Sequence, residues 1–143
     1  MRILGLDLGE KRIGVAISDQ DHTFAKGLAT IERNEKEIEK IKSLVKKYNV
    51  TQIIYGIPIR NDGSLSGRAE KMLSIITILK QSMPLVTFIP WDERMTTVEA
   101  ENILLMADIS RKKRKKIRDK LAAQIILQSY LDSLYLKNHS SEE

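Results

Sequence analysis

The first third of the chain is a succession of short apolar runs separated by polar turns. These runs cover residues 3–8, 13–18 and 25–31. The first run is almost entirely apolar, which is typical of a central strand covered on both faces. Because the turns between the three runs are short, the pattern predicts three consecutive strands in an antiparallel meander.

The remainder of the chain alternates between helical and strand-like segments. Apolar positions spaced three and four residues apart indicate helices. The first helix is expected to open at Asn34, where Glu37 would complete an Asn version of the capping box. The later segments are a strand at 51–57, a helix at 68–81, a strand at 85–89, a helix from Thr96 to near Asp108, a helix capped by Ser110 and ending near Leu136, and a flexible tail at 138–143. We therefore expect an α/β fold: a five-stranded mixed sheet, antiparallel then parallel, flanked by helices.

Three carboxylates interrupt this hydrophobic pattern. Asp7 lies inside the first strand, on the face that it shares with Ile3 and Gly5. Glu93 follows the fifth strand, and Asp119 lies on the apolar stripe of the last helix. The other members of that stripe are Ala122, Ala123, Ile126 and Tyr130. A buried carboxylate is unfavourable unless it is paired or binds a cation, so folding is expected to bring the three together.

Each carboxylate also has an ordinary structural interpretation. Asp7 could accept hydrogen bonds at a turn near the end of its strand. Glu93 could pair with Arg94 or lie near a helix N-terminus, where a negative charge is favourable. Asp119 could form an ion pair with one of the basic side chains on the preceding turns of its own helix.

Taken together, the three carboxylates form a hard-oxygen donor set that suits Mg²⁺ or Mn²⁺. They fit two-metal cleavage of a phosphodiester, with Asp7 as the bridging ligand because it lies on the stiffest element. The neighbouring Asp92 is an alternative to Glu93 as a ligand. Glycines at 5, 9 and 14 are expected to leave backbone room for a phosphate. His22 and His139 lie in a turn and in the tail, and neither suits a ligand or a general base.

The charge distribution points to a polyanionic partner. The chain has a net charge of +5, but residues 111–120 alone carry eight basic groups and one acid, so the remainder is at −2. A localised basic block is typical of proteins that bind a phosphate backbone, although a solvated helix face is an equally ordinary explanation. With no cysteine, no apolar run of membrane-spanning length and no signal-like N-terminus, we expect a cytoplasmic protein.

Further basic side chains flank the carboxylates. The loop from Arg60 to Arg68 contains Asn61-Asp62-Gly63-Ser64 and leads into a helix start, a favourable place for a phosphate, although an ordinary surface loop would read the same way. Arg94 could bind a phosphate through two hydrogen bonds. The candidate substrate contacts are Arg12, Arg60, Arg68, Arg94, Arg111, Lys112, Lys113, Arg114, Lys115 and Lys116.

The chain resembles the RuvX (YqgF) family of the RNase H-like superfamily. The matching segments are 3–9 (ILGLDLG), 12–19 (RIGVAISD), 55–58 (YGIP), 61–64 (NDGS), 91–97 (WDERMTT) and 119–128 (DKLAAQIILQ). The resemblance implies one RNase H-like nuclease domain over residues 1–137, with catalytic and metal-binding acids at Asp7, Glu93 and Asp119. The chain departs from RuvC-type resolvases, which carry an acid on the fourth strand where this chain has Tyr55-Gly56-Ile57. It also departs from its own family in the 60–68 loop, where a Gly-Pro-Arg run is common.

The resemblance implies a metal-dependent endonuclease in 5′-end maturation of pre-16S rRNA, with the ribosomal small-subunit precursor as a candidate partner. Its main alternative is resolution of Holliday junctions in branched DNA, for which a dimer would suit a two-fold symmetric substrate. A non-catalytic RNA-binding assembly factor is a third hypothesis. The segment Asp7-Leu8-Gly9 also resembles the phosphate loop of actin-like and sugar-kinase ATPases, which need two such domains. The sequence leaves monomer and homodimer open.

Overall fold

The computed structural model describes residues 1–57, 62–63, 69–92 and 111–140, and within the last range it describes the side chains of 118–137. Five strands form one sheet in the order β3-β2-β1-β4-β5. Their bounds are β1 (Arg2–Leu8), β2 (Arg12–Ser18), β3 (Ala25–Glu32), β4 (Val50–Ile57) and β5 (Thr87–Asp92). β1, β2 and β3 pair antiparallel, whereas β4 pairs parallel with β1 and β5. The predicted mixed sheet, with a meander followed by parallel strands, is confirmed.

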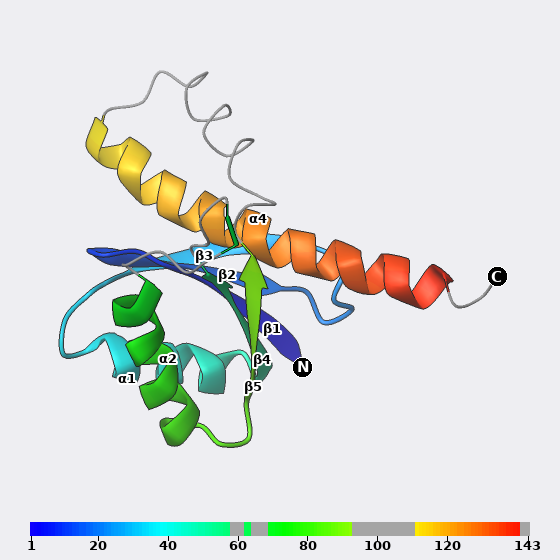
Figure 1. The fold of residues 1–143 in the computed structure, drawn as a ribbon, viewed down its shortest axis with the longest axis horizontal. Coiled ribbons are helices and arrows are strands. Elements are labelled where there is room, and N and C mark those ends of the chain that lie inside the picture. The colour runs from blue at the N-terminus through cyan, green and yellow to red at the C-terminus, as the bar shows by residue number, and fades with distance from the viewer. Residues whose placement is uncertain (58–61, 64–68, 93–110, 141–143) are drawn as a thin grey trace.

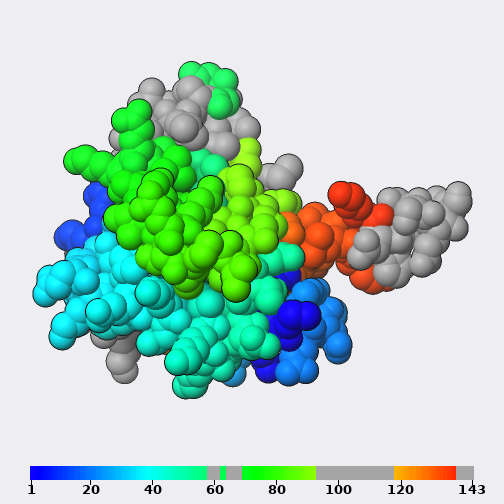
Figure 2. Space-filling model, turned by 90° about the horizontal axis from the view of Figure 1, so that it is seen from below, coloured from blue at the N-terminus to red at the C-terminus, as the bar shows by residue number. Residues whose placement is uncertain are grey.

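Helices cover both faces of this sheet (Figure 1). The shorter helices α1 (Glu37–Lys47) and α2 (Ala69–Ser82) lie on one face, and the long helix α4 (Arg111–Ser140) crosses the other. Figure 2 looks onto the α1/α2 side, where the C-terminal part of α4 extends beyond the body of the molecule. Among the described residues, no helix is both long and apolar enough to cross a membrane.

The alternation of side chains along β1 divides the core into two clusters. Leu4, Leu6 and Leu8 belong to the cluster on the α1/α2 side, whereas Ile3 belongs to the cluster under α4. Because successive side chains of a strand point to opposite faces, Asp7 lies on the α4 side of the sheet. The central, doubly covered position predicted for this strand is confirmed.

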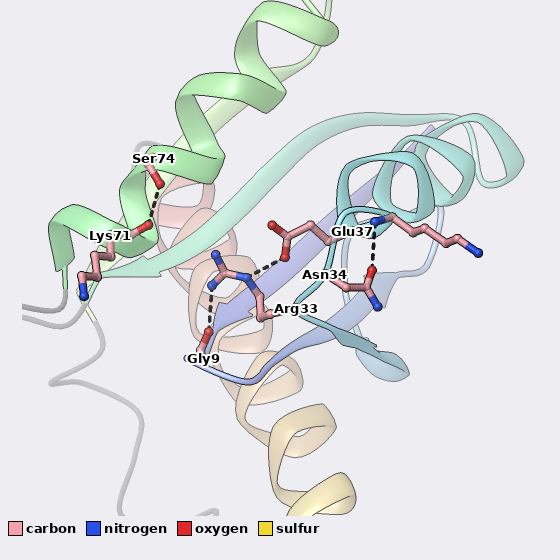
Figure 3. A network of polar contacts seen from close by, with 7 residues as sticks. Gly9, Arg33, Asn34, Glu37, Lys71 and Ser74 are labelled. Carbon is pink, nitrogen blue, oxygen red and sulfur yellow. Dashed lines mark hydrogen bonds and ion pairs between the residues drawn. The ribbon is translucent and has the colours of Figure 1, made fainter.

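The start of α1 differs from the prediction. The helix begins at Glu37 rather than after Asn34, and its N-cap residue Lys36 makes no side-chain capping bond. The Asn34 side chain instead accepts a hydrogen bond from the Lys36 backbone N–H at 2.9 Å. Glu37 does not close a capping box, because its carboxylate pairs with the guanidinium of Arg33 at 2.6 Å (Figure 3). A salt bridge to the arginine four residues earlier thus replaced the expected bond to the backbone.

The last strand and the last helix also have different bounds. β5 starts at Thr87 and continues through Pro90 to Asp92, whereas Leu85, expected in the strand, is 95% exposed. Proline is tolerated there because β5 is an edge strand, so its missing N–H breaks no ladder bond. α4 starts directly after Ser110 as expected, but it runs to Ser140 instead of ending near Leu136. The helix expected between Thr96 and Asp108 lies outside the described residues.

Candidate active site

Asp7 is held near the carboxyl end of β1, the strand at the centre of the sheet. It is partly buried, and both of its chain neighbours, Leu6 and Leu8, are buried in the core on the opposite face. Its register partner on β2 is Gly14. Directly paired residues on antiparallel strands have Cα atoms about 4.5–5.5 Å apart. Whatever covers Gly14 on the α4 side therefore lies beside Asp7.

The backbone of α4 at Asp119 covers Gly14. A Cβ atom added at Gly14 would collide with the carbonyl group of Asp119, with the carbonyl carbon only 2.6 Å away. A Cβ at Gly5 would similarly lie 2.8 Å from Cβ of Leu127. The missing side chains thus let the helix approach the sheet closely. The predicted convergence of Asp7 and Asp119 on one face is consistent with this packing, but the glycines at 5 and 14 admit a helix rather than the phosphate that we expected.

The packing of α4 fixes which of its residues face the sheet. Ala123, Ile126, Leu127 and Leu131 are buried against it, which places Asp119 at the start of the same stripe. Ala123 and Ile126 were predicted to face the sheet, while Ala122 is only partly buried. Tyr130, also predicted, packs edge-on against Trp91 of β5, with ring centroids 5.5 Å apart.

Asp119 forms an ion pair with Arg12, at the start of β2. Arg12 Nε donates a hydrogen bond to Asp119 Oδ2 at 3.1 Å, and the two side chains are 22% and 26% exposed. Burial raises the pKa of Asp119, while the charge and hydrogen bond of Arg12 and the charge of Arg118 act in the opposite direction. An ion pair was one interpretation of Asp119, and among the described side chains its partner, Arg12, comes from the sheet.

Two glutamines of α4, which the sequence analysis did not single out, fasten the helix to β3. The side-chain oxygen of Gln124 accepts a hydrogen bond from the Gly27 N–H at 3.0 Å, and that of Gln128 accepts one from the Ala25 N–H at 2.8 Å. The Gln128 amide also donates to the carbonyl of Thr23 at 3.0 Å. These contacts fix the position of α4 along the sheet and so the position of Asp119. Their i, i+4 spacing on the buried side of a helix was the available signal.

Arg33, which the sequence analysis also did not single out, supports the turn between β1 and β2. Its guanidinium donates to the carbonyl of Gly9 at 2.9 Å and pairs with Glu37 of α1 (Figure 3). Its backbone N–H donates to the carbonyl of Lys11 at 2.9 Å. The turn that separates Asp7 from Arg12 is therefore tied to β3 and α1. Only the tertiary structure brings Arg33 to this turn.

The end of β5 supplies the third candidate acid. Ile89 and Trp91 pack in the cluster under α4, whereas Phe88 packs on the α1/α2 side, so Asp92 shares the side of Phe88. Glu93 and Arg94 lie outside the described residues. Gly56 of β4 is the register partner of Trp91 and offers no side chain, so the fourth strand contributes no acid at this position.

The remaining substrate candidates divide into two groups. Arg60, Arg68 and Arg94 lie outside the described residues. Arg111, Lys112, Lys113, Arg114, Lys115 and Lys116 form the first turns of α4, where the structure describes the helix but not the side chains. The basic block therefore precedes Asp119 on the same continuous helix.

Two of the three candidate metal ligands lie among the described residues. Asp7 and Asp119 are partly buried carboxylates on the same face of the sheet, a donor type that suits Mg²⁺ or Mn²⁺. Within the described part of the chain, no group of three or more His, Cys, Asp or Glu side chains is placed to hold a metal ion. His22, as expected, lies in a turn, where its ring contacts the carbonyl of Met1.

Comparison with solved structures defines the class of fold. The chain is similar to Thermus thermophilus RuvC in complex with a Holliday junction substrate, with a TM-score of 0.57 and 11% identity over 94% of this chain and 96% of that one. It is also similar to the fowlpox virus Holliday junction resolvase, with a TM-score of 0.56 and 16% identity over 93% and 99% of the two chains. The fold is therefore the RNase H-like fold of these resolvases.

Comparison of sequences defines the family. Residues 1–133 match the family model described as "RuvX: Holliday junction resolvase", and the chain belongs to this family. Relatives named "Putative pre-16S rRNA nuclease" include those of Thermoanaerobacter pseudethanolicus, 51% identical over 93% of this chain and 97% of the relative, and Halothermothrix orenii, 52% identical over 92% and 95%. A third, from Desulfitobacterium hafniense, is 45% identical over the full length of both. The chain is thus an enzyme of the nuclease class, a hydrolase of phosphodiester bonds.

Proposed function

We propose that the chain is a divalent-metal-dependent endonuclease that acts in 5′-end maturation of pre-16S rRNA. Asp7, Glu93 and Asp119 are the proposed catalytic and metal-binding residues, and Mg²⁺ or Mn²⁺ is the proposed cofactor. The names of the relatives support rRNA as the substrate. An rRNA precursor as substrate would also agree with the expected cytoplasmic location.

The observation that carries this proposal is the packing of Asp119 over Gly14. Gly14 is the register partner of Asp7, so two carboxylates 112 positions apart in sequence lie on one face of the sheet. Burial already raises the pKa of Asp119. A desolvated carboxylate is unfavourable unless a positive charge compensates it. A bound cation would offset that cost.

Each residue has a separate role in this proposal. Asp7, on the central strand, would hold the cation most rigidly, and Asp119 would complete the donor pair from α4. We take Glu93 rather than Asp92 as the third ligand, because Asp92 belongs to the side of β5 that faces away from α4. Lewis-acid stabilisation of the charge that develops on the scissile phosphate is the chemistry that the cation would supply.

The basic block would hold the RNA without reading its sequence. Residues 111–120 carry a net charge of +7 with Asp119 included, and six of their basic side chains, at positions 111–116, precede it on α4. Backbone phosphates paired with lysine and arginine release counterions, so binding should weaken steeply as salt concentration rises. Arg60, Arg68 and Arg94 are proposed as additional phosphate contacts.

The test is metal-dependent cleavage of a precursor 16S rRNA fragment by the wild type and by Asp7→Asn. We expect cleavage with Mg²⁺ or Mn²⁺ that falls at least about 10³-fold in the variant, with RNA binding retained or slightly strengthened. Asp19→Asn is a matched control, because Asp19 accepts hydrogen bonds from the N–H groups of Thr23 and Phe24 in a turn at the opposite end of β2. Equal cleavage by Asp7→Asn and the wild type would refute the proposal.

Resolution of Holliday junctions is the second candidate function. The description of the matched family model and the Holliday junction bound to the similar RuvC structure favour it. A four-way DNA junction added to the same assay separates the two activities. Preferential cleavage of the junction, by a protein that is dimeric in solution, would favour resolution. Salt-sensitive RNA binding without cleavage of either substrate would indicate the non-catalytic assembly factor.

A further inference from the structure

Arg12 forms an ion pair with Asp119. The guanidinium reaches the carboxylate through a single hydrogen bond, from Nε to Oδ2 at 3.1 Å. Both side chains keep about a quarter of their surface exposed, so the pair is accessible from solvent. The backbone of Arg12 is fixed, because its carbonyl accepts a hydrogen bond from the Gly9 N–H at 2.9 Å. Only the side chain of Arg12 is therefore free to change partner.

A guanidinium and a divalent cation compete for the same carboxylate. Both are stabilised by the negative charge of Asp119, and each repels the other when they are close. A dication bound between Asp7 and Asp119 would lie next to the Arg12 side chain. The attraction that holds Arg12 in the metal-free chain then becomes an electrostatic penalty on metal binding.

A second carboxylate is available to Arg12 at the same edge of the sheet. Glu32 is the register partner of Arg12 on β3, so the two side chains leave the sheet on the same face. Glu32 is exposed, and its charge is close enough to raise the pKa of Asp119. An arginine side chain that leaves Asp119 therefore has a negatively charged neighbour within the same pair of strands.

We propose that Arg12 is an exchangeable counter-ion, which neutralises Asp119 in the metal-free chain and moves to Glu32 when a divalent cation binds. The proposal rests on the metal site of the proposed function. Arg12 therefore has a positioning role. Without metal it keeps the Asp119 carboxylate in place, and when metal binds its guanidinium moves away from Asp119 but stays beside the site.

The first test is the dissociation constant of Mn²⁺, measured by titration calorimetry with no nucleic acid present. Arg12→Met should bind Mn²⁺ about fivefold more tightly than the wild type, because a partly exposed ion pair of ordinary strength no longer competes. Arg118→Met is the matched control: Arg118 also acts on Asp119 through its charge, but it is exposed and no hydrogen bond joins the two. Its effect should be clearly smaller. Unchanged or weaker Mn²⁺ binding by Arg12→Met would overturn the proposal.

The role of Glu32 is tested by a double-mutant cycle. Glu32→Gln should weaken Mn²⁺ binding in the wild-type background, because Arg12 loses its second partner. The same substitution should have a much smaller effect in the Arg12→Met background. Equal effects in both backgrounds would show that Glu32 acts on the metal by its charge alone, and would overturn the exchange.

Failure of this inference can be distinguished from failure of the proposed function. If the wild type binds Mn²⁺, Asp7→Asn does not, and Arg12→Met matches the wild type, only the role of Arg12 fails. If neither the wild type nor Arg12→Met binds Mn²⁺ at millimolar concentration, the metal site and the inference fail together. Far-ultraviolet circular dichroism and thermal unfolding of each variant establish that the folded protein is being compared.

Discussion

The two faces of the sheet are built in different ways. On the α1/α2 side, β1 presents Leu4, Leu6 and Leu8 to a continuous apolar cluster. On the α4 side, the same strand presents Ile3, Gly5 and Asp7, and the helix above them packs close to the backbone. One strand therefore gives large apolar side chains to one face, and small or charged ones to the other.

The α1/α2 face mainly stabilises the fold, whereas the α4 face carries the candidate site. Large buried side chains supply most of the hydrophobic stabilisation, so the α1/α2 face anchors the central strand. On the α4 face, Asp119 and Arg12 form a partly exposed ion pair. The pair offsets part of the cost of desolvating the Asp119 carboxylate. The leucines that β1 buries on the α1/α2 side thus fix the position of Asp7 on the opposite face.

The largest expected effect comes from removing a side chain from the apolar face. Leu6→Ala should lower the free energy of unfolding by roughly 2–5 kcal/mol, because Leu6 is fully buried. Leu127→Ala, on the α4 face, should cost a similar amount but should also weaken Mn²⁺ binding, since Leu127 holds α4 against Gly5. Urea unfolding and Mn²⁺ titration measure the two effects. If Leu6→Ala weakens metal binding as much as Leu127→Ala does, the two faces are not independent.

A smaller effect is expected from a single methyl group on the α4 face. Gly14→Ala should destabilise the fold by roughly 1–3 kcal/mol and displace α4, because the new Cβ meets the backbone of Asp119, which cannot move by a rotamer change. Gly27→Ala is the matched control, since its Cβ would lie 3.2 Å from Cβ of Lys120, a tight contact but not a collision with the helix backbone. Thermal unfolding and cleavage assays compare them. Full activity of Gly14→Ala would show that close approach of α4 is not required.

The smallest effect concerns pH. Burial raises the pKa of Asp119 above its ordinary value of 3.8, so the folded chain holds that proton more tightly than the unfolded chain. The stability that protonated Asp119 contributes is present below pH 3.8 and is lost as the pH rises through the pKa of Asp119 in the folded chain. Asp119→Asn, which does not ionise, should therefore gain stability relative to the wild type from acid to neutral pH. Urea unfolding without divalent ions measures this difference.

Asp19 should show the opposite trend. Hydrogen bonds from the backbone N–H groups of Phe24 and Thr23 lower its pKa, so its contribution is present above pH 3.8 and is lost as the pH falls through the lower folded value. Asp19→Asn should therefore lose stability relative to the wild type as the pH rises. Parallel trends in the two variants would contradict the assignment of Asp119 as a desolvated carboxylate.

Much of the fold followed from local patterns in the sequence. The period-two pattern at residues 3–8 correctly predicted a central strand with Asp7 opposite its leucines. The helical stripe of Asp119, Ala123 and Ile126 correctly predicted the face that packs on the sheet. These predictions succeeded because both patterns depend only on the geometry of one element. The position of Pro90 in β5 was missed because it depends on whether that strand lies at the edge.

The contacts that build the candidate site were much harder to predict. Gly5 and Gly14 were identified as positions of close approach, but their partner is α4 and not a phosphate. An ion pair was one interpretation of Asp119, and the partner that the structure describes is Arg12, from a distant strand. In each case the residue type indicated a special role, but the partner could not be predicted, because the two residues are over 100 positions apart in sequence.

The sequence by itself determined the strands and helices that the structure describes, to within a few residues at their ends. It also determined their apolar faces, the three acids as candidates and the basic block before Asp119. Tertiary structure alone decided that α4 lies over β2, that Arg12 neutralises Asp119, and that Arg33 supports the turn between β1 and β2. The physical reason is the range of the interactions. Backbone periodicity acts over a few residues, whereas ion pairs and helix–sheet contacts form between segments that meet only when the chain has folded.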